Sequence, residues 1–275
     1  MVYDNGRNKS VLFGGYNGQF LSDTWEWDGT NWIERSPSVS PSARHHHAMA
    51  FDSTRNVTVL FGGRVNDSNL GDTWEWDGTN WTQRSPTLSP PARWLHGMTY
   101  DSSREVVVLY GGSGDCGGAC YDTWEWNGSN WVQRDPMSSP LGRWGFGITF
   151  DSTRNVTVLF GGRSSGTLAE TWEWDGINWW DYQLSTLPPD RENIGMAYDS
   201  NNQATVIFGG YSDSLGYIGD TWEWNGGTWI NTTPSDKPSS RDNSSMVFDT
   251  LRGVSFMFGG YDGTNWLSDI WEYKR

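Results

Sequence analysis

Lysine is scarce in this sequence, and long apolar stretches are missing from it. Only Lys9, Lys237 and Lys274 occur among 275 residues, and 33 acidic residues against 19 lysines and arginines give a formal net charge of −14. A chain of this charge is repelled by phosphate backbones and anionic lipids, so we expect no nucleic-acid partner. No run of 18 apolar residues occurs, so we expect no membrane insertion.

Cysteine is limited to Cys116 and Cys120, which lie in a glycine-rich segment. Two cysteines this close predict a local disulfide, which needs an oxidising compartment, and the absence of a second pair excludes a zinc ribbon. Asn-x-Ser/Thr sequons point loosely the same way, so we expect a secreted or cell-surface protein. The eight candidate glycosylation sites are Asn8, Asn56, Asn66, Asn80, Asn127, Asn155, Asn231 and Asn243.

Tryptophan, in contrast, is abundant, and its 20 copies are placed periodically. A Gly-Gly doublet follows a hydrophobic run six times, beginning at Gly14, Gly62, Gly111, Gly161, Gly209 and Gly259. Trp-Glu-Trp follows the first five doublets, and Trp271-Glu272-Tyr273 follows the sixth. The spacing indicates six copies of a unit of about 49 residues.

One unit resolves into four short strands. In the second copy we expect strands at 48–51, 57–61 and 72–76, and a fourth that begins near Trp81 and ends before Ser85-Pro86. The alternation in Trp74-Glu75-Trp76 puts both indoles on one face of the strand, where we predict that they form core between sheets. Four strands repeated at this period predict an all-β propeller with four-stranded antiparallel blades.

The repeat resembles the kelch repeat, and the resemblance covers the whole chain. It rests on the Gly-Gly doublet after a hydrophobic strand and on an aromatic residue followed by a spaced tryptophan. It implies that residues 1–275 form a single six-bladed kelch β-propeller, similar to the bacterial kelch arrays of large extracellular proteins. Trp27 and its equivalents stand where kelch repeats usually have tyrosine, a departure that concerns the packing between blades.

The repeat is out of phase with the two ends of the sequence. The first unit begins inside its first strand, at Met1–Asp4, and the last ends after its third strand, at Tyr273. We therefore expect the sixth blade to lack an outer strand in cis and to leave an open edge. Because open edges recruit strands, we predict strand donation to this blade from a neighbouring chain or from flanking sequence.

The strand order sorts the loops onto two faces. The Asp-Ser-Thr-Arg and Asp-Gly turns form one face and hardly vary, whereas the loops after Gly-Gly and the segments before each first strand form the other, here called the loop face. Variable loops on a rigid scaffold usually carry binding. The candidate ligand-binding residues on or near it are Arg44, His46, Arg64, Arg93, Trp94, His96, Arg143, Trp144, Arg163, Arg191, Tyr211, Arg241 and Tyr261.

Five of these candidates are arginines that recur once per unit: Arg44, Arg93, Arg143, Arg191 and Arg241. Either they form a ring that holds an anion at a channel mouth, or each bonds backbone carbonyls and links blades, and the periodicity favours the second interpretation. His45-His46-His47 and His96 suggest a metal site, but adjacent strand residues point to opposite faces. We therefore predict no metal.

No nucleophile elbow, Walker loop, dinucleotide-binding fingerprint or His-Glu-x-x-His motif is present. We predict no catalytic residue and no cofactor, and we expect a non-enzymatic extracellular binding or scaffold module whose loop face engages a protein or glycan. One alternative is a structural subunit of a surface layer, stalk or filament, assembled through the open edge of the sixth blade. The other is a sugar-active propeller enzyme, for which the arginines lack an evident acid or base partner.

Overall fold

The computed structural model describes residues 1–275, which form strands, turns and loops without a helix. Contacts divide the chain into two compact units, Met1–Asp135 (unit 1) and Pro136–Arg275 (unit 2). All strand pairs are antiparallel, and five of the nine sheets have four strands, an organisation that fits a β-propeller. No helix long and apolar enough to cross a membrane is present.

Unit 1 contains three four-stranded sheets, here called repeat sheets 1 to 3. Repeat sheet 1 consists of β1 (Val2–Asp4), β2 (Lys9–Tyr16), β3 (Phe20–Trp27) and β4 (Trp32–Arg35). Repeat sheet 2 consists of β5 (Ala48–Asp52), β6 (Val57–Phe61), β9 (Thr73–Trp76) and β10 (Trp81–Arg84). Repeat sheet 3 consists of β12 (Gly97–Asp101), β13 (Val106–Tyr110), β16 (Thr123–Trp126) and β17 (Trp131–Arg134). The loops add the short strands β7 (Arg64–Val65), β8 (Ser68–Asn69), β11 (Arg93–Trp94), β14 (Ser113–Gly114) and β15 (Gly118–Ala119).

Unit 2 contains repeat sheets 4 to 6. Repeat sheet 4 consists of β18 (Gly147–Asp151), β19 (Val156–Phe160), β20 (Thr171–Trp174) and β21 (Trp179–Tyr182). Repeat sheet 5 consists of β22 (Gly195–Asp199), β23 (Ala204–Phe208), β26 (Thr221–Trp224) and β27 (Trp229–Asn231), with the loop hairpin β24 (Tyr211–Ser212) and β25 (Gly216–Tyr217). Repeat sheet 6 has only three strands, β28 (Ser245–Asp249), β29 (Val254–Tyr261) and β30 (Trp266–Tyr273).

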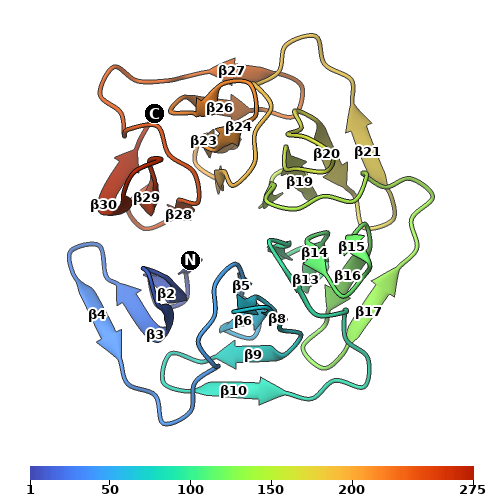
Figure 1. The fold of residues 1–275 in the computed structure, drawn as a ribbon, viewed down its shortest axis with the longest axis vertical. Coiled ribbons are helices and arrows are strands. Elements are labelled where there is room, and N and C mark those ends of the chain that lie inside the picture. The colour runs from blue at the N-terminus through green and yellow to red at the C-terminus, as the bar shows by residue number, and fades with distance from the viewer. The chain divides into compact units, whose positions relative to one another are not determined.

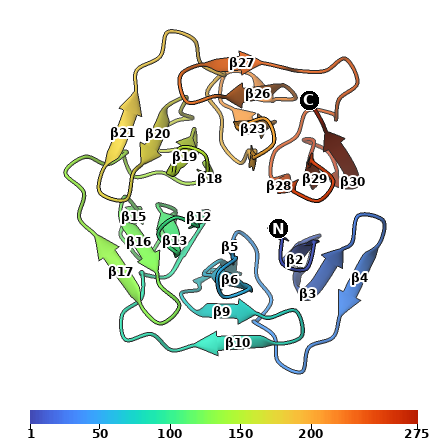
Figure 2. The same ribbon diagram turned by 180° about the vertical axis from the view of Figure 1, so that it is seen from behind.

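The strands of every repeat sheet lie in chain order, as the sequence predicts. In repeat sheet 2 the first strand β5 and the fourth strand β10 lie at opposite edges of the sheet (Figure 1). The second and third strands pair Thr58 with Trp76 and Leu60 with Trp74, so both indoles leave the same face of β9. In unit 2, β27 lies alongside β26, whereas β30 pairs with β29 only (Figure 2).

The turns explain why the chain folds back where it does. Asp52 accepts a 3.0 Å hydrogen bond from the backbone N–H of Arg55, and Asn56 closes the turn with a φ of 53°. The doublet after the second strand needs glycine, because Gly62 has a φ of 66° and a Cβ placed there would lie 2.6 Å from the carbonyl oxygen of Arg93. The glycine after the second strand is therefore required by backbone conformation and by lack of space for a side chain.

Within each unit the core lies between successive repeat sheets and is built largely from the periodic tryptophans. Between repeat sheets 1 and 2, the indoles of Trp74, Trp76 and Trp81 pack with Phe13 and Leu60. Trp76 is fully buried, as are its equivalents Trp126, Trp174 and Trp224 to within 1% exposure. The prediction that Trp-Glu-Trp forms core is confirmed for both indoles in repeat sheets 2 and 3 and for the second indole in repeat sheets 4 and 5. Trp25 and Trp27 of repeat sheet 1 are half-buried.

Candidate functional site

The side chains of the five periodic arginines are buried beneath the surface. Each is at most 1% exposed, and each donates to the carbonyl oxygen of the first glycine in its own doublet, as Arg44 does to Gly62 at 3.0 Å. Arg44 also donates to both carboxylate oxygens of Asp72, at 2.6 and 2.8 Å. The partners of Arg93, Arg143, Arg191 and Arg241 are Asp122, Glu170, Asp220 and Asp269.

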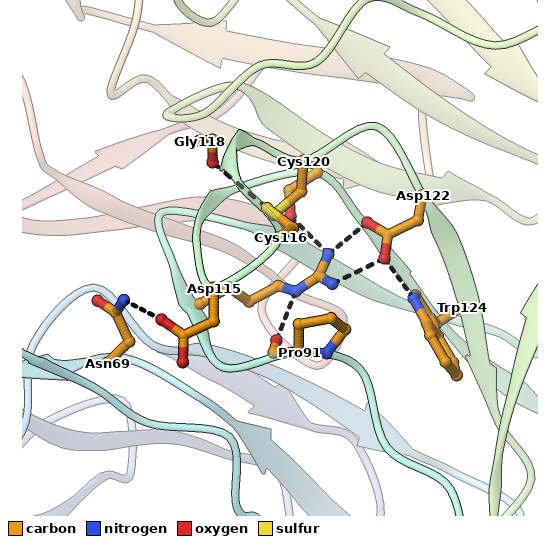
Figure 3. The surroundings of a disulfide bond; sticks show 10 residues. Asn69, Pro91, Asp115, Cys116, Gly118, Cys120, Asp122 and Trp124 are labelled. Atoms are coloured by element: carbon orange, nitrogen blue, oxygen red, sulfur yellow. Dashed lines mark hydrogen bonds and ion pairs between the residues drawn. A yellow bond between two sulfur atoms is a disulfide. The ribbon is translucent and has the colours of Figure 1, made fainter.

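These pairs hold a charged carboxylate beneath the loop face. Burial raises the pKa of Asp122, but hydrogen bonds and charge from Arg93 and a 2.6 Å bond from the indole of Trp124 outweigh it and lower that pKa (Figure 3). The pKa of Asp72 is lowered for the same reasons, through Arg44 and Trp74. The guanidinium groups are thus occupied by carboxylates of the chain itself, and their role here is to fix the loops.

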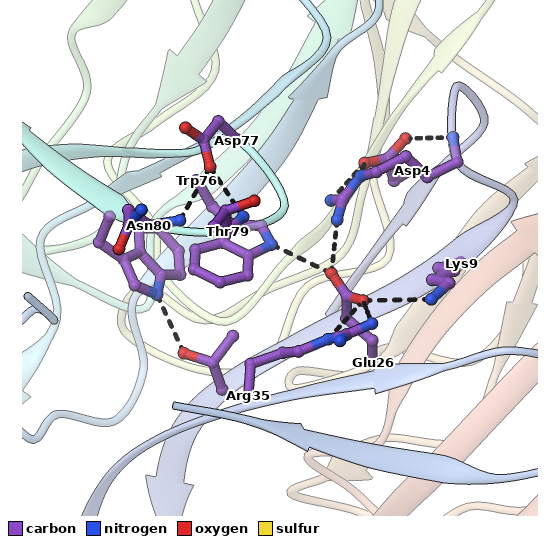
Figure 4. A network of polar contacts seen from close by, with 11 residues as sticks. Asp4, Lys9, Glu26, Arg35, Trp76, Asp77, Thr79 and Asn80 are labelled. Carbon is purple, nitrogen blue, oxygen red and sulfur yellow. Dashed lines mark hydrogen bonds and ion pairs between the residues drawn. The ribbon is translucent and has the colours of Figure 1, made fainter. Parts of the chain in front are cut away.

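A second polar network surrounds the glutamate of each Trp-Glu-Trp motif. Glu26 is fully buried and accepts hydrogen bonds from Arg35 at 2.6 Å, from Arg7 at 2.5 Å and from the indole of Trp76 in the next repeat sheet at 3.2 Å (Figure 4). Burial opposes ionisation of Glu26, but the charge of Arg7 and these hydrogen bonds lower its pKa. This network was not predicted, although one signal for it exists in the sequence: an arginine recurs three residues after the fourth-strand tryptophan in Arg35, Arg84 and Arg134.

The loop face is held together by backbone hydrogen bonds that run from repeat to repeat. The segment before each first strand contains a residue with positive φ, as at His46 and Leu95 in unit 1 and at Asn193 and Asn243 in unit 2. In unit 1 the N–H of Leu95 donates to the carbonyl of His46 at 2.9 Å, and in unit 2 the N–H of Asn243 donates to that of Asn193 at 2.8 Å. Side chains of successive repeats are thereby brought side by side.

In unit 1 this arrangement gathers aromatic and cationic side chains, here called the unit 1 aromatic row: Tyr16, Phe20, His45, His46, Trp94 and Arg64. The rings of His45 and His46 lie 4.2 Å apart, the ring of His46 lies 5.5 Å from that of Trp94, and the guanidinium carbon of Arg64 lies 5.0 Å from the Trp94 ring. Tyr16, at one end of the row, is 41% exposed. Sequence reasoning named His46, Arg64 and Trp94 but missed Tyr16 and Phe20.

Unit 2 carries a second row, here called the unit 2 aromatic row: Tyr211, Tyr217, Tyr261 and Trp266. Successive ring centroids lie 5.2, 5.9 and 4.8 Å apart, and Trp266 is 52% exposed. Trp144 is half-buried and pairs through its backbone with Arg163, whose side chain forms ion pairs with Glu192 and Asp213. Tyr211 and Tyr261 therefore belong to one surface, and Arg163 is held by carboxylates.

His96, in contrast, lies below the surface. It is 7% exposed and packs edge-on against Phe61, with ring centroids 5.6 Å apart. Burial, and then the charge of Arg93, lower its pKa from 6.5 to about 3. Burial also lowers the pKa of His47 well below its usual value. No group of three His, Cys, Asp or Glu residues is arranged to hold a metal ion.

The loop after the third doublet is closed by the predicted disulfide, which is present between Cys116 and Cys120, with Cα atoms 5.7 Å apart (Figure 3). Asp115, next to it, accepts a 2.8 Å hydrogen bond from the Nδ2 of Asn69 in the neighbouring loop. The disulfide is of the kind that persists outside the reducing cytosol.

Of the sequon asparagines, Asn8, Asn56, Asn66, Asn127, Asn155 and Asn231 are exposed, and Asn80 and Asn243 are half-buried. Their glycosylation stays a prediction.

Comparison with known proteins identifies no relative of this chain. No family model matches the chain, and no curated protein matches it.

Proposed function

We propose that this chain is a six-bladed kelch-type β-propeller that acts as a non-enzymatic extracellular binding or scaffold module, with a loop face that engages a protein or glycan. The 49-residue repeat supports the fold, and the Cys116–Cys120 disulfide supports an extracellular location. The six repeat sheets and the two aromatic rows are the structural basis of the proposal.

The unit 1 aromatic row carries the proposal. Tyrosine, tryptophan and arginine are the residues that contribute most to binding energy at interfaces, because they combine a large apolar surface with a polar group. Arg64 over Trp94 places a cation on an indole face, and Tyr16 extends the same surface toward solvent. The hydrogen-bonded backbone beneath the row means that little conformational entropy is lost when a ligand binds.

The burial of the five periodic arginines favours binding by the aromatic rows over a sugar-active site. An enzyme that used these arginines would have to free them from Asp72 and its equivalents, which already hold each guanidinium in two hydrogen bonds or an ion pair. The ligand surface proposed here therefore consists of the aromatic rows with Arg64 and Trp144, and it does not include Arg44, Arg93, Arg143, Arg191 or Arg241.

The test is a glycan array and an extracellular-protein array probed with the intact chain and with Trp94→Ala and Tyr261→Ala. A ligand held by either row should bind the matching variant at least about tenfold more weakly, as expected for loss of an aromatic hot spot. Trp180→Ala is the matched control, because Trp180 is 57% exposed, lies on the fourth strand β21 and belongs to neither row. The absence of any ligand on both arrays, or equal binding by all three variants, would contradict the proposal.

A further inference from the structure

Three of the fourth strands, β10, β17 and β27, each insert one tryptophan into the same position on the preceding repeat sheet of their unit. The indole Nε1 of Trp81, Trp131 and Trp229 donates a 2.9 Å hydrogen bond to Oγ1 of Thr24, Thr73 and Thr171, respectively. Each of these indoles also packs against the phenylalanine that directly precedes the Gly-Gly doublet of that preceding sheet, with ring centroids 4.9 to 5.2 Å apart. A threonine and a phenylalanine therefore form a socket for the next sheet's indole.

Repeat sheet 5 offers the same two residues to repeat sheet 6. Thr221 begins its third strand and Phe208 ends its second, at the positions of Thr24 and Phe13. Repeat sheet 6 has no fourth strand, and Thr221 and Phe208 line an open pocket together with Met257, Trp271 and Tyr273. The socket is present, and no tryptophan of the chain is inserted in it.

The exposed edge strand has a second unfilled feature beside this socket. Glu272 accepts a hydrogen bond from Arg252, as Glu75 does from Arg55. Glu75 accepts a further hydrogen bond from Arg84 on the fourth strand of its own sheet. The side chain of Glu272 is 43% exposed, whereas that of Glu75 is 1% exposed. The acceptor for a fourth-strand cation is thus open to solvent on β30.

The spacing of the missing groups follows from the complete sheets. Trp81 pairs directly with Trp76, and Arg84, three residues later, lies on the face that carries Glu75. Tyr273 of β30 takes the place of Trp76, since its hydroxyl bonds Glu223 of the preceding sheet at 2.7 Å, as Trp76 bonds Glu26. A complementary strand would therefore place a tryptophan opposite Tyr273 and an arginine beside Glu272.

We propose that β30 accepts an extended peptide segment of the pattern Trp-x-x-Arg, paired antiparallel, with its indole in the socket lined by Phe208 and Thr221. The fourth strands β4, β10, β17, β21 and β27 cannot supply it, because each is already paired in its own sheet. The segment would gain backbone hydrogen bonds from the edge, burial of the indole and an ion pair with Glu272. No residue of either aromatic row lines the socket.

The test uses a fluorescein-labelled peptide with the sequence of residues 78–86, titrated by anisotropy against the intact chain. We expect saturable binding with a dissociation constant below about 1 mM. The peptide with Trp81→Ala should bind at least about tenfold more weakly. Glu272→Gln in the protein should weaken the original peptide about threefold and leave the Arg84→Gln peptide unaffected, while Glu105→Gln, at an exposed turn, serves as the control.

Failure to bind up to about 1 mM, or binding that ignores both the tryptophan and Glu272, would overturn the proposal. Light scattering in parallel tests a different occupant. If the protein is a dimer, remains one after the peptide is added and does not bind the peptide, a second copy of the chain covers β30. That result would also overturn the proposal. Because the loop-face variants are not involved, these outcomes are independent of the array experiment.

Discussion

The indole Nε1 of Trp81 donates a 2.9 Å hydrogen bond to Oγ1 of Thr24, which belongs to the preceding repeat sheet. Trp81 is 2% exposed and Thr24 is 1% exposed, so the bond is formed where water does not compete. The same pairing recurs between Trp131 and Thr73. Tryptophan thus joins the repeat sheets both by its apolar area and by a directed polar contact.

Thr24→Val should destabilise the protein by about 1–3 kcal/mol, because it keeps the shape of the side chain and leaves the Trp81 N–H buried without an acceptor. Thr58→Val is the matched control, since Thr58 is equally buried and its hydroxyl has no hydrogen-bond partner. That change should be neutral or slightly stabilising. Urea unfolding measures both variants, and equal losses of stability would contradict the role given to the Thr24 hydroxyl.

Arg93→Met should destabilise the protein by about 3 kcal/mol, because it leaves Asp122 charged, mostly buried and without its cation. Lys237→Met removes an exposed charge and should change the free energy of unfolding by less than about 0.5 kcal/mol. The comparison is made by denaturant unfolding at pH 7. An Arg93→Met variant as stable as Lys237→Met would show that the buried pair contributes nothing.

Stability should fall in two steps as the medium is acidified. The pKa of His96 is lowered by burial from 6.5 to about 3, so the unfolded chain takes up a proton that the folded chain refuses. Its contribution is complete above pH 6.5 and is lost as the pH falls toward 3. Burial raises the pKa values of Asp72 and Asp122, but their arginines outweigh it and lower both from 3.8. These two carboxylates therefore add a further loss of stability below pH 3.8.

The first step is tested by urea midpoints at pH 7, 5.5 and 4.5 for the original chain and for His96→Leu. The variant lacks the buried imidazole, so its midpoint should depend less on pH in this range, whatever its stability at pH 7. His47, whose pKa is also lowered by burial, should retain part of the slope. Identical slopes would show that His96 does not control the first step.

The strand pattern could be predicted from the sequence because it is local and repeated. Alternation in Trp74-Glu75-Trp76 and the glycines of each doublet define strand faces and ends, and the structure has them at those places. The disulfide followed from the short separation of Cys116 and Cys120. The partners of the periodic arginines were harder to predict, since Arg44 and Asp72 lie 28 residues apart and meet only after the sheet has formed.

The aromatic rows could not be predicted as rows. Tyr16, His46 and Trp94 belong to different repeats, and they become neighbours only through backbone turns with positive φ at His46 and Leu95. Leucine rarely adopts that conformation, and histidine adopts it only in a minority of cases, so the sequence carried no clear sign of it. The sequence was enough to predict individual candidate residues from their type and position. Which of them lie next to one another could be seen only in the folded chain.

The indole–threonine hydrogen bond between consecutive repeat sheets has a direction: the later sheet donates, and the earlier one accepts. Each repeat inside a unit therefore has two unlike ends, a donor end facing backward along the chain and an acceptor end facing forward. An additional whole repeat, spliced in phase between two others in unit 1, would find a complementary neighbour at both ends. Gene duplication in steps of one repeat is thus a growth path that this architecture permits without redesign of any existing interface.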